Sequence, residues 1–463
     1  MSEIQREQIS VAAERAVLVA VHLPGRYVDA SDPFSELRAL AETAGAEVVG
    51  ELIQNRRLPS GKTYLGKGKT QELAGLVGTT AASLVIFDND LSPAQIRAVE
   101  EATQCKVVDR SELILDIFAN RAATHAAKIQ VEIAQLEYTY PRLRAMWSHL
   151  EQVAGGAPVG IGTRGPGEKQ LEIDRRLVQQ RLRQLKRELG RIQGRKAREV
   201  QRRNIDYFTV GLVGYTNAGK STLFNRLTAG GAFTHRRLFA TLSTRVERWD
   251  LDGGNAVMLS DTVGFIHDLP HHLVASFRST LEETVFAQLL IIVLDVADPN
   301  APMQLETVYR TLDEIGAADQ PRVLGLNKID LLDDDRELLV WLNRYPDAVP
   351  ISAAAGDGLD ALAEVVRTEV RGDVRQVKVT MPMSDGKTIA FLEKRAEVLD
   401  RRYGDGQAEL TVRIGRRQVD ELLAQGAKIR INGLDPREAV KREWNGPESS
   451  PVARSPLPPS ERS

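Results

Sequence analysis

The chain has 463 residues, of which 42% are hydrophobic, and a formal net charge of −2 at pH 7. This length predicts about three domains, and the near-neutral charge provides no global basic field that would attract nucleic acid. The single cysteine, Cys105, excludes an internal disulfide and a cysteine-rich zinc module. Residues 1–15 are polar and no apolar run approaches the roughly 18 residues of a spanning helix, so we expect a cytoplasmic protein without a signal peptide or membrane span.

Residues 1–110 alternate between strand-like and helix-like runs. Apolar strands are predicted at residues 16–21, 46–53, 83–87 and 106–108. A helix is predicted to begin after Ser92 as its N-cap, with Pro93 in its first position, and to run through Glu101. This alternation predicts a small N-terminal α/β domain with a largely parallel sheet.

Residues 111–204 carry a different pattern, in which apolar residues recur at steps of four and three. The first series is Ile129, Ile133, Leu136, Tyr140 and Leu143, and the second is Val178, Leu182, Leu185, Leu189 and Ile192. Both series are typical seams of two-stranded coiled coils. Because the glycine-rich run 154–169 interrupts any helix between them, the pattern predicts a long antiparallel helical hairpin with a glycine-rich tip.

The second arm of this hairpin is strongly basic. Residues 169–203 contain 13 Lys or Arg and 4 Asp or Glu, a local charge of about +9 in a nearly neutral chain. A basic rod with a slim tip suits insertion into folded RNA by shape and phosphate contact, whereas the simpler alternative is a solvated helix face. The candidate RNA contacts at the tip are Arg164, Gly165, Pro166, Gly167 and Lys169.

A phosphate-binding loop opens the next segment, residues 205–370. A strand is predicted at 208–213 and a helix at 222–227, and between them stands a G-x-x-x-x-G-K-S sequence. Its glycines let backbone N–H groups converge on phosphate oxygens, and the helix N-terminus adds partial positive charge. Lys220 is expected to reach the β- and γ-phosphates, and the Ser221 hydroxyl to bind Mg²⁺. The nucleotide-binding residues of this loop are Gly214, Tyr215, Thr216, Asn217, Ala218, Gly219, Lys220 and Ser221.

The motif Asp261-Thr262-Val263-Gly264 ends a strand predicted at 256–260. Asp261 is expected to hold Mg²⁺ through a water, and the Gly264 N–H to meet the γ-phosphate. A mobile loop before this motif would supply a second Mg²⁺ hydroxyl, for which Thr241 is the candidate. Position alone does not separate it from Thr234, Ser243 and Thr244. Loops of this kind become ordered by the γ-phosphate and are released on hydrolysis.

The residue after this motif is Phe265, where many GTPases place a glutamine that orients the attacking water. A phenylalanine cannot polarise water, so we expect slow intrinsic hydrolysis that a partner accelerates by ordering the loops. The nearby histidines His267, His271 and His272 match no common zinc spacing, and we expect no metal there.

A guanine signature follows the predicted strand 323–326. In Asn327-Lys328-Ile329-Asp330, the Asp330 carboxylate can accept both the ring N–H and the exocyclic amine of guanine. Adenine offers no such donor pair, so this residue selects GTP over ATP. Asn327 and the Lys328 stem would brace the base. Backbone N–H groups of Ser352, Ala353 and Ala354 would face the guanine O6.

The C-terminal part is divided into two predicted regions. Residues 371–435 form a small α/β domain with strands at 377–381 and 408–414 and a helix at 389–399. Residues 436–463 form a disordered tail. The predicted fold is therefore α/β and multidomain, with an N-terminal α/β domain, a helical hairpin, a P-loop GTPase domain with a mixed, mostly parallel sheet, and this C-terminal domain.

Several of these segments together resemble the HflX-type GTPases of the Obg–HflX superfamily. The resemblance spans about residues 15–370 and rests on segments 109–118, 130–136, 164–172, 214–221, 239–242, 261–265, 269–271 and 327–330. It implies a translational GTPase that binds the large ribosomal subunit and its ribosomal RNA near the peptidyl transferase centre. Such proteins split stalled or idle ribosomes under stress and keep the subunits apart.

The resemblance also assigns roles to residues. It places the second Mg²⁺ ligand on Thr241 beside Ser221. Together with the motifs above, this makes Lys220, Thr241 and Gly264 the candidate catalytic residues. Its cofactors are GTP, GDP and Mg²⁺. The segment Phe239, Ala240, Thr241, Leu242 and Ser243 would contact the nucleotide. We further expect a monomer without a DNA partner, and peripheral membrane association stays open. Ser243-Thr244-Arg245 departs from the family's usual Asp-Pro-Thr, which leaves the behaviour of this loop open.

Three alternatives remain at this point. The chain is a ribosome-splitting GTPase, a GTPase of ribosome assembly or RNA modification, or an RNA-binding adaptor regulated by GTP. The N-terminal domain of some relatives is credited with ATP binding. Here the corresponding residues 65–69 either contribute to such a site or form an exposed turn that opens a helix.

Overall fold

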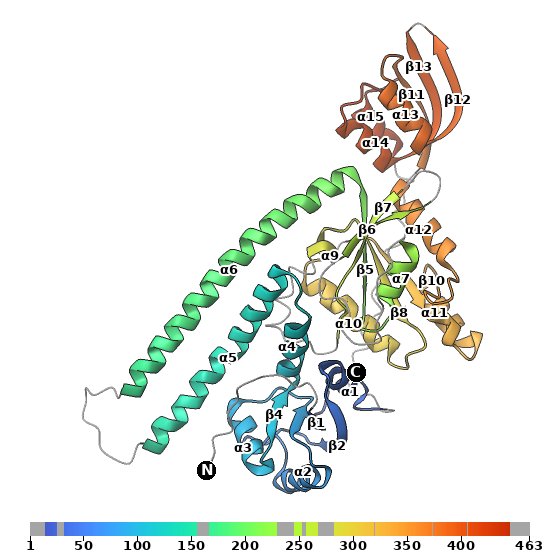
Figure 1. The fold of residues 1–463 in the computed structure, drawn as a ribbon. Helices are drawn as coiled ribbons and strands as arrows, with labels where there is room; N and C mark the ends of the chain where they lie inside the picture. Colours follow the sequence, from blue (N-terminus) through green and yellow to red (C-terminus); the bar gives the residue numbers. More distant parts are fainter. Residues whose placement is uncertain are drawn as a thin grey trace. The chain divides into compact units, whose positions relative to one another are not determined.

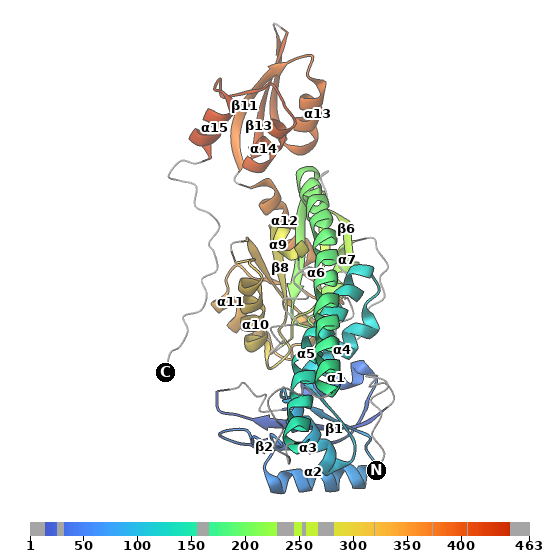
Figure 2. The same ribbon diagram turned by 90° about the vertical axis from the view of Figure 1, so that its left-hand side faces the viewer.

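The structure is a computed structural model that describes residues 14–25, 32–154, 166–228, 245–251, 256–266, 282–318, 320–372, 374–404 and 406–444 (Figures 1 and 2). The chain divides into two compact units. The first comprises residues 1–197, 234–244 and 263–282, and the second comprises 198–233, 245–262 and 283–463. Within the described ranges, no helix combines the length and apolar character needed to span a bilayer.

The first unit begins with a four-stranded parallel sheet in the order β2-β1-β3-β4. Its strands are β1 (Arg15–His22), β2 (Glu47–Asn55), β3 (Leu84–Phe87) and β4 (Lys106–Asp109), and its helices are α1 (Ser35–Ala44), α2 (Lys67–Thr80), α3 (Pro93–Thr103) and α4 (Arg110–Arg121). Ser92 caps α3 by accepting the Gln95 N–H, with Pro93 first in the helix, as predicted. β1 is buried on both faces, which is why it reads as a continuous apolar run.

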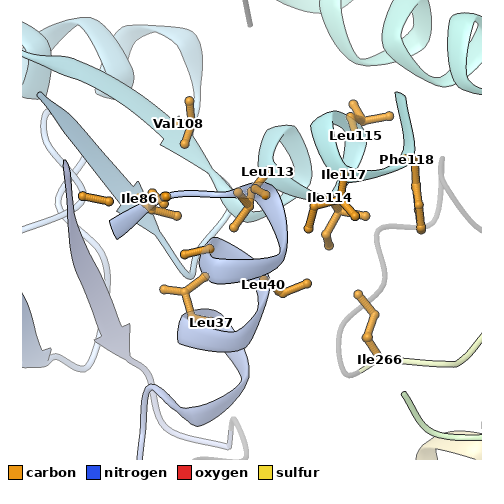
Figure 3. Close-up of a cluster of buried hydrophobic side chains, with 14 of the residues drawn as sticks. Leu37, Leu40, Ile86, Val108, Leu113, Ile114, Leu115, Ile117, Phe118 and Ile266 are labelled. Atoms are coloured by element: carbon orange, nitrogen blue, oxygen red, sulfur yellow. The ribbon is translucent and has the colours of Figure 1, made fainter. Parts of the chain in front are cut away.

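One core cluster of this unit packs beside α1 and α4. It includes Leu37 and Leu40 of α1, Ile86 of β3 and Phe118 of α4 (Figure 3). Val263 and Ile266, from the stretch 263–282, belong to the same cluster, and only 6% and 2% of their surfaces are exposed. Val263 and Ile266, which follow Thr262 closely in the chain, are therefore part of the hydrophobic core of the first unit.

The hairpin consists of α5 (His125–Ala154) and α6 (Pro166–Asp206), which run side by side in both ribbon views (Figures 1 and 2). The predicted seam is confirmed where side chains are described. Its buried and partly buried members are Ile129, Ile133, Leu136, Leu182, Leu185, Leu189 and Ile192. The contacts His125–Glu188 and Glu132–Arg181 show that the helices are antiparallel, because one number falls as the other rises.

The predicted tip at 154–169 is too long. Ala154 is the last residue of α5, and α6 already begins at Pro166. Proline favours the first position of a helix because its φ is preset and its missing N–H would be unpaired there anyway. Pro166, Gly167 and Lys169 are therefore helical, whereas Arg164 and Gly165 lie outside the described residues.

The second unit contains a six-stranded sheet in the order β10-β9-β8-β5-β7-β6. Its strands are β5 (Phe208–Gly214), β6 (Arg245–Asp250), β7 (Ala256–Asp261), β8 (Leu289–Asp295), β9 (Arg322–Asn327) and β10 (Val349–Pro350). Only the β6–β7 pair is antiparallel among these described strands, which confirms the mixed, mostly parallel sheet. The accompanying helices are α7 (Lys220–Leu227), α9 (Glu282–Phe286), α10 (Ala301–Glu314), the 3₁₀ helix η1 (Ile329–Leu331), α11 (Asp335–Arg344) and α12 (Leu359–Arg371).

The C-terminal part of the second unit has a β-α-β-β-α-β arrangement followed by a last helix. Its elements are β11 (Val374–Pro382), α13 (Gly386–Arg395), β12 (Glu397–Gly404), β13 (Gln407–Gly415), α14 (Arg416–Ala424), β14 (Arg430–Ile431) and α15 (Pro436–Glu443). The antiparallel sheet has the order β12-β13-β11-β14. The helix predicted through residue 399 is wrong at its end, because Glu397 already begins β12.

The predicted disordered tail is also wrong at its start. Asp435 caps α15 by accepting the Arg437 N–H, and Pro436 occupies the first helical position. Val440 and Trp444 are spaced by one helical turn and are buried in the C-terminal core. Residues 436–443 are therefore helical, and residues 445–463 lie outside the described ranges.

Candidate nucleotide-binding site

The candidate site lies where the parallel strands of the second unit end. β5 ends at Gly214, β7 at Asp261, β8 at Asp295 and β9 at Asn327. Asp295 and Asn327 are register partners in neighbouring strands. The carboxyl edge of a parallel sheet is where α/β proteins bind ligands, and this edge collects the predicted phosphate and guanine segments of the second unit.

The loop after β5 depends on two glycines. Gly214 has φ +154° and a Cβ there would lie 2.3 Å from the Val293 carbonyl oxygen. Gly219 has φ +98° and a Cβ there would lie 2.3 Å from Nδ2 of Asn327. Side chains are excluded at both positions by backbone conformation and by space, so the backbone can approach a phosphate group closely.

Lys220 is buried at the start of α7. Its Nζ donates to the carbonyl oxygens of Gly214 (3.1 Å) and Tyr215 (2.7 Å). Burial lowers the pKa of Lys220 from 10.5 to about 8, and the nearby Asp261 carboxylate opposes that shift. A cation held inside the loop in this way is suited to binding phosphate oxygens.

Ser221 and Asp261 lie together beside this lysine. The Ser221 Oγ donates to Oδ2 of Asp261 at 2.7 Å. A hydroxyl and a carboxylate fit Mg²⁺, which keeps several waters and takes few protein oxygens when it also binds phosphates. Asp261 is positioned by its strand and by the next residue, since the Thr262 Oγ1 donates to the Leu212 carbonyl oxygen.

Asn327 connects the phosphate loop with the segment Ser352 to Ala354, which is predicted to face the guanine O6. Its Nδ2 donates to the Ala218 carbonyl oxygen at 2.7 Å, and its Oδ1 accepts the Ala353 N–H at 2.9 Å. The side chain is buried, so both hydrogen bonds are protected from water. The predicted residues Ala218, Asn327 and Ala353 are thus brought together, and the exposed Asp330 follows in η1.

Sequence reasoning missed Asp295. Its Oδ2 lies 2.5 Å from Nζ of Lys328, and 12% of its side chain is exposed. The sequence signal for Asp295 is its position at the end of a buried strand. It ends β8 just as Asp261 ends β7 and Asn327 ends β9.

The remaining predicted site residues stay predictions, because no described contact joins them to the phosphate loop. Val263 and Gly264 belong to the first unit, and Phe265 is buried there with 4% exposure. Phe239, Ala240, Thr241, Leu242 and Ser243 lie outside the described residues, as do His267, His271 and His272. Among the described side chains, no cluster of His, Cys, Asp or Glu could hold a metal ion by itself.

A glycine-constrained phosphate loop with a buried lysine, joined through Asn327 to an Asn-Lys-x-Asp segment, defines a P-loop GTPase. Four family models match the chain. They are described as "GTP-binding GTPase N-terminal" (residues 31–119), "GTP-binding GTPase Middle Region" (121–204), "50S ribosome-binding GTPase" (209–328) and "HflX C-terminal domain" (337–431).

Curated relatives agree with these models. The chain is 43% identical to GTPase HflX of Lacrimispora saccharolytica, covering 84% of this chain and 91% of that protein. It is 42% identical to GTPase HflX of Escherichia coli K12, covering 87% and 94%. The chain therefore belongs to the HflX family of GTPases and hydrolyses GTP. A GTP-binding protein from Sulfolobus solfataricus, solved with GDP, is 25% identical and covers 77% of this chain and 98% of its own, with a TM-score of 0.42.

Proposed function

We propose that this GTPase binds the large ribosomal subunit through its ribosomal RNA, separates stalled or idle ribosomes, and uses Mg²⁺-dependent GTP hydrolysis to set how long it stays bound. The observation that carries this proposal is a basic groove along α6. The match of residues 209–328 to a family described as ribosome-binding supports it.

The groove has a volume of about 930 Å³. Its arginines are spaced by seven and then by four residues, which places them along one side of the helix. These residues, which we call the arginine face, are Arg176, Arg183, Arg187, Arg191 and Arg195. A row of guanidinium groups at this spacing suits the repeating phosphates of an RNA backbone.

The two acidic residues of α5 whose side chains are described pair with basic residues outside this face. Glu132 pairs with Arg181, and Glu137 pairs with Lys186. Among the described side chains, no carboxylate forms an ion pair with Arg183, Arg187 or Arg191. The hairpin therefore separates its basic residues into a paired set that joins the helices and an outward set that is available to a polyanion.

Control by GTP is supported by the division of one motif between the two units. Asp261 and Thr262 belong to the second unit, whereas Val263 and Gly264 belong to the first, which also contains the arginine face. Val263 is anchored in the hydrophobic cluster of that first unit. A Gly264 N–H that meets the γ-phosphate would therefore transmit the nucleotide state to the unit that contacts RNA.

Slow intrinsic hydrolysis is part of the same proposal. Phe265 occupies the position of the water-orienting glutamine and its side chain is buried. We expect ribosomes to raise the hydrolysis rate by ordering this region. Thr241 is our proposed second hydroxyl ligand of Mg²⁺, with Ser221 as the first.

Sedimentation with 70S ribosomes tests the proposal. We expect the wild type to bind the large subunit best with a non-hydrolysable GTP analogue and to release free subunits. The variant R183Q/R187Q/R191Q should bind more weakly, with a salt slope lower by about one per lost phosphate contact. The exposed pair Arg401 and Arg402 on β12 provides a control, R401Q/R402Q, that should bind normally.

Three results would count against parts of this proposal. Equal ribosome binding with GTP, GDP and the analogue would contradict the GTP switch. A Lys220→Ala variant that still released subunits catalytically would favour an RNA-binding adaptor. Association with assembly intermediates rather than 70S ribosomes would favour a role in ribosome assembly or RNA modification.

A further inference from the structure

The end of β8 holds the guanine segment at two points. The Val296 N–H donates to the Asn327 carbonyl oxygen at 3.1 Å, and the Asp295 carboxylate contacts the Lys328 ammonium at 2.5 Å. The first contact is ordinary backbone pairing beside a parallel strand. The second uses side chains from residues 33 apart in the sequence and fixes the far end of a flexible lysine.

Lys328 needs such a restraint. Its backbone has φ +65°, a left-handed conformation that a non-glycine residue seldom adopts. Its side chain has four rotatable carbons and loses rotamer freedom when it lies flat against a base. An acid that holds the ammonium before the nucleotide arrives reduces the freedom that binding must remove.

We propose that Asp295 is a positioning residue for guanine binding, which acts by holding the Lys328 stem against the plane of the base. This inference rests on the proposed placement of the base at Asn327 to Asp330. Lys328 contacts the face of the ring, whereas Asp330 reads its edge. Asp295 therefore contributes affinity for any purine of this shape, and Asp330 contributes the choice of guanine.

Asp295 also has a local role that the test must separate. Its Oδ1 accepts the Ala297 N–H at 3.2 Å in the turn after β8. Asp295→Asn retains an oxygen for this turn and removes the charge that holds Lys328. Asp298, three residues later, accepts the Asn300 N–H and the Gln304 side-chain amide, and neither of these described contacts involves the guanine segment, so Asp298→Asn is the matched control.

The experiment measures the affinity of the full-length chain for GDP, inosine diphosphate and ADP. We expect D295N to weaken the binding of GDP and inosine diphosphate equally, by roughly five- to tenfold, which is within the cost of immobilising one long side chain on binding. D298N should change neither affinity. The hydrolysis rate at saturating GTP should stay the same in D295N, so the loss appears in KM and not in kcat.

A double-mutant cycle decides whether Asp295 acts through Lys328. In a Lys328→Ala background, D295N should have no further effect on GDP affinity. An equal loss in both backgrounds, or a loss matched by D298N, would overturn the proposal. If the wild type bound ADP as well as GDP, the placement of the base itself would be wrong. Additive effects of D295N and Lys328→Ala in a chain that selects guanine would contradict only the role of Asp295.

Discussion

The chain contains one parallel sheet and one mostly parallel sheet, and the carboxyl edges of their parallel strands are filled in different ways. At the edge of the N-terminal sheet, side chains of the chain itself occupy the space. Arg110 pairs with Asp88 at 2.6 Å and with Glu36, and Ser111 donates to Asp90. Tyr138 of α5 donates to the buried Asp109 at 2.7 Å. This edge therefore fastens the hairpin to the sheet.

At the edge of the GTPase sheet, backbone groups dominate. Gly214 and Gly219 bring the loop close to its neighbours, and Lys220 and Asn327 donate to loop carbonyl oxygens. The parallel architecture is common to both edges, so the architecture alone does not make a nucleotide site. The two edges differ in what occupies them. Ion pairs between side chains close one edge, whereas a glycine-rich loop that a phosphate can approach lines the other.

The largest expected effect comes from removing the ion pairs of Arg110 at the carboxyl edge of the N-terminal sheet. Arg110→Ala leaves the Asp88 and Glu36 carboxylates without their buried cation, and we expect a loss of about 3–5 kcal/mol in the stability of the N-terminal domain. Only 6% of the Arg110 side chain is exposed. Hydrogen exchange of the β3 and β4 amides measures the loss.

A surface pair serves as the control for Arg110. Arg38 pairs with Asp32 and Glu51 on the same domain but is 34% exposed. Arg38→Ala should cost at most about 1 kcal/mol because exposed pairs contribute little. Equal losses for the two variants would mean that the Arg110 cluster is not the fastening we describe.

The second-largest expected effect comes from adding a side chain to the phosphate loop at the edge of the GTPase sheet. A Gly219→Ala side chain would lie 2.3 Å from the Asn327 amide nitrogen at a backbone φ of +98°. We expect GDP affinity to fall by about 100-fold, because strain and overlap together cost roughly 2–3 kcal/mol.

Gly68 in α2 is the matched position in the N-terminal domain, because a Cβ there would have no heavy atom within 4 Å. Gly68→Ala should leave GDP affinity unchanged. Calorimetry with GDP checks both variants, and a normal affinity for Gly219→Ala would show that the loop tolerates a side chain after all.

The smallest effect concerns the charge of Lys220. Its pKa of about 8 rises when phosphate oxygens bind, so binding takes up protons. Affinity should therefore be full below pH 8 and fall as pH rises, by about fourfold between pH 7 and pH 8.5. Calorimetry in two buffers of different ionisation enthalpy should find an uptake of about half a proton near pH 8. A pH-independent affinity with no proton uptake would contradict the lowered pKa.

Much of the fold was predictable because buried elements leave strong patterns. The apolar runs at 208–213 and 323–326 are β5 and β9, since central parallel strands are buried on both faces. The hairpin seam was predictable for a similar reason, because Ile133 and Leu185 repeat with the period of a coiled coil. The phosphate loop was readable because its glycines and lysine are adjacent in sequence.

The failures have local causes. The helix predicted through residue 399 runs into β12, and α15 was missed because its apolar residues Val440 and Trp444 are few and stand next to a Pro- and Ser-rich stretch. Asp295 was missed because its partner Lys328 is 33 residues away in the sequence, just after the end of β9. No pattern in neighbouring residues records such a pair.

The sequence by itself determined the secondary structure of the buried elements, the phosphate loop and the guanine segment, because each depends on the period or order of nearby residues. The tertiary structure decided which carboxyl edge is closed by Arg110 and which is lined by glycines. It also decided that Asp295 holds Lys328 and that Val263 is buried in the core of the first unit. These facts depend on strand order and on packing between distant segments, which a one-dimensional pattern does not specify.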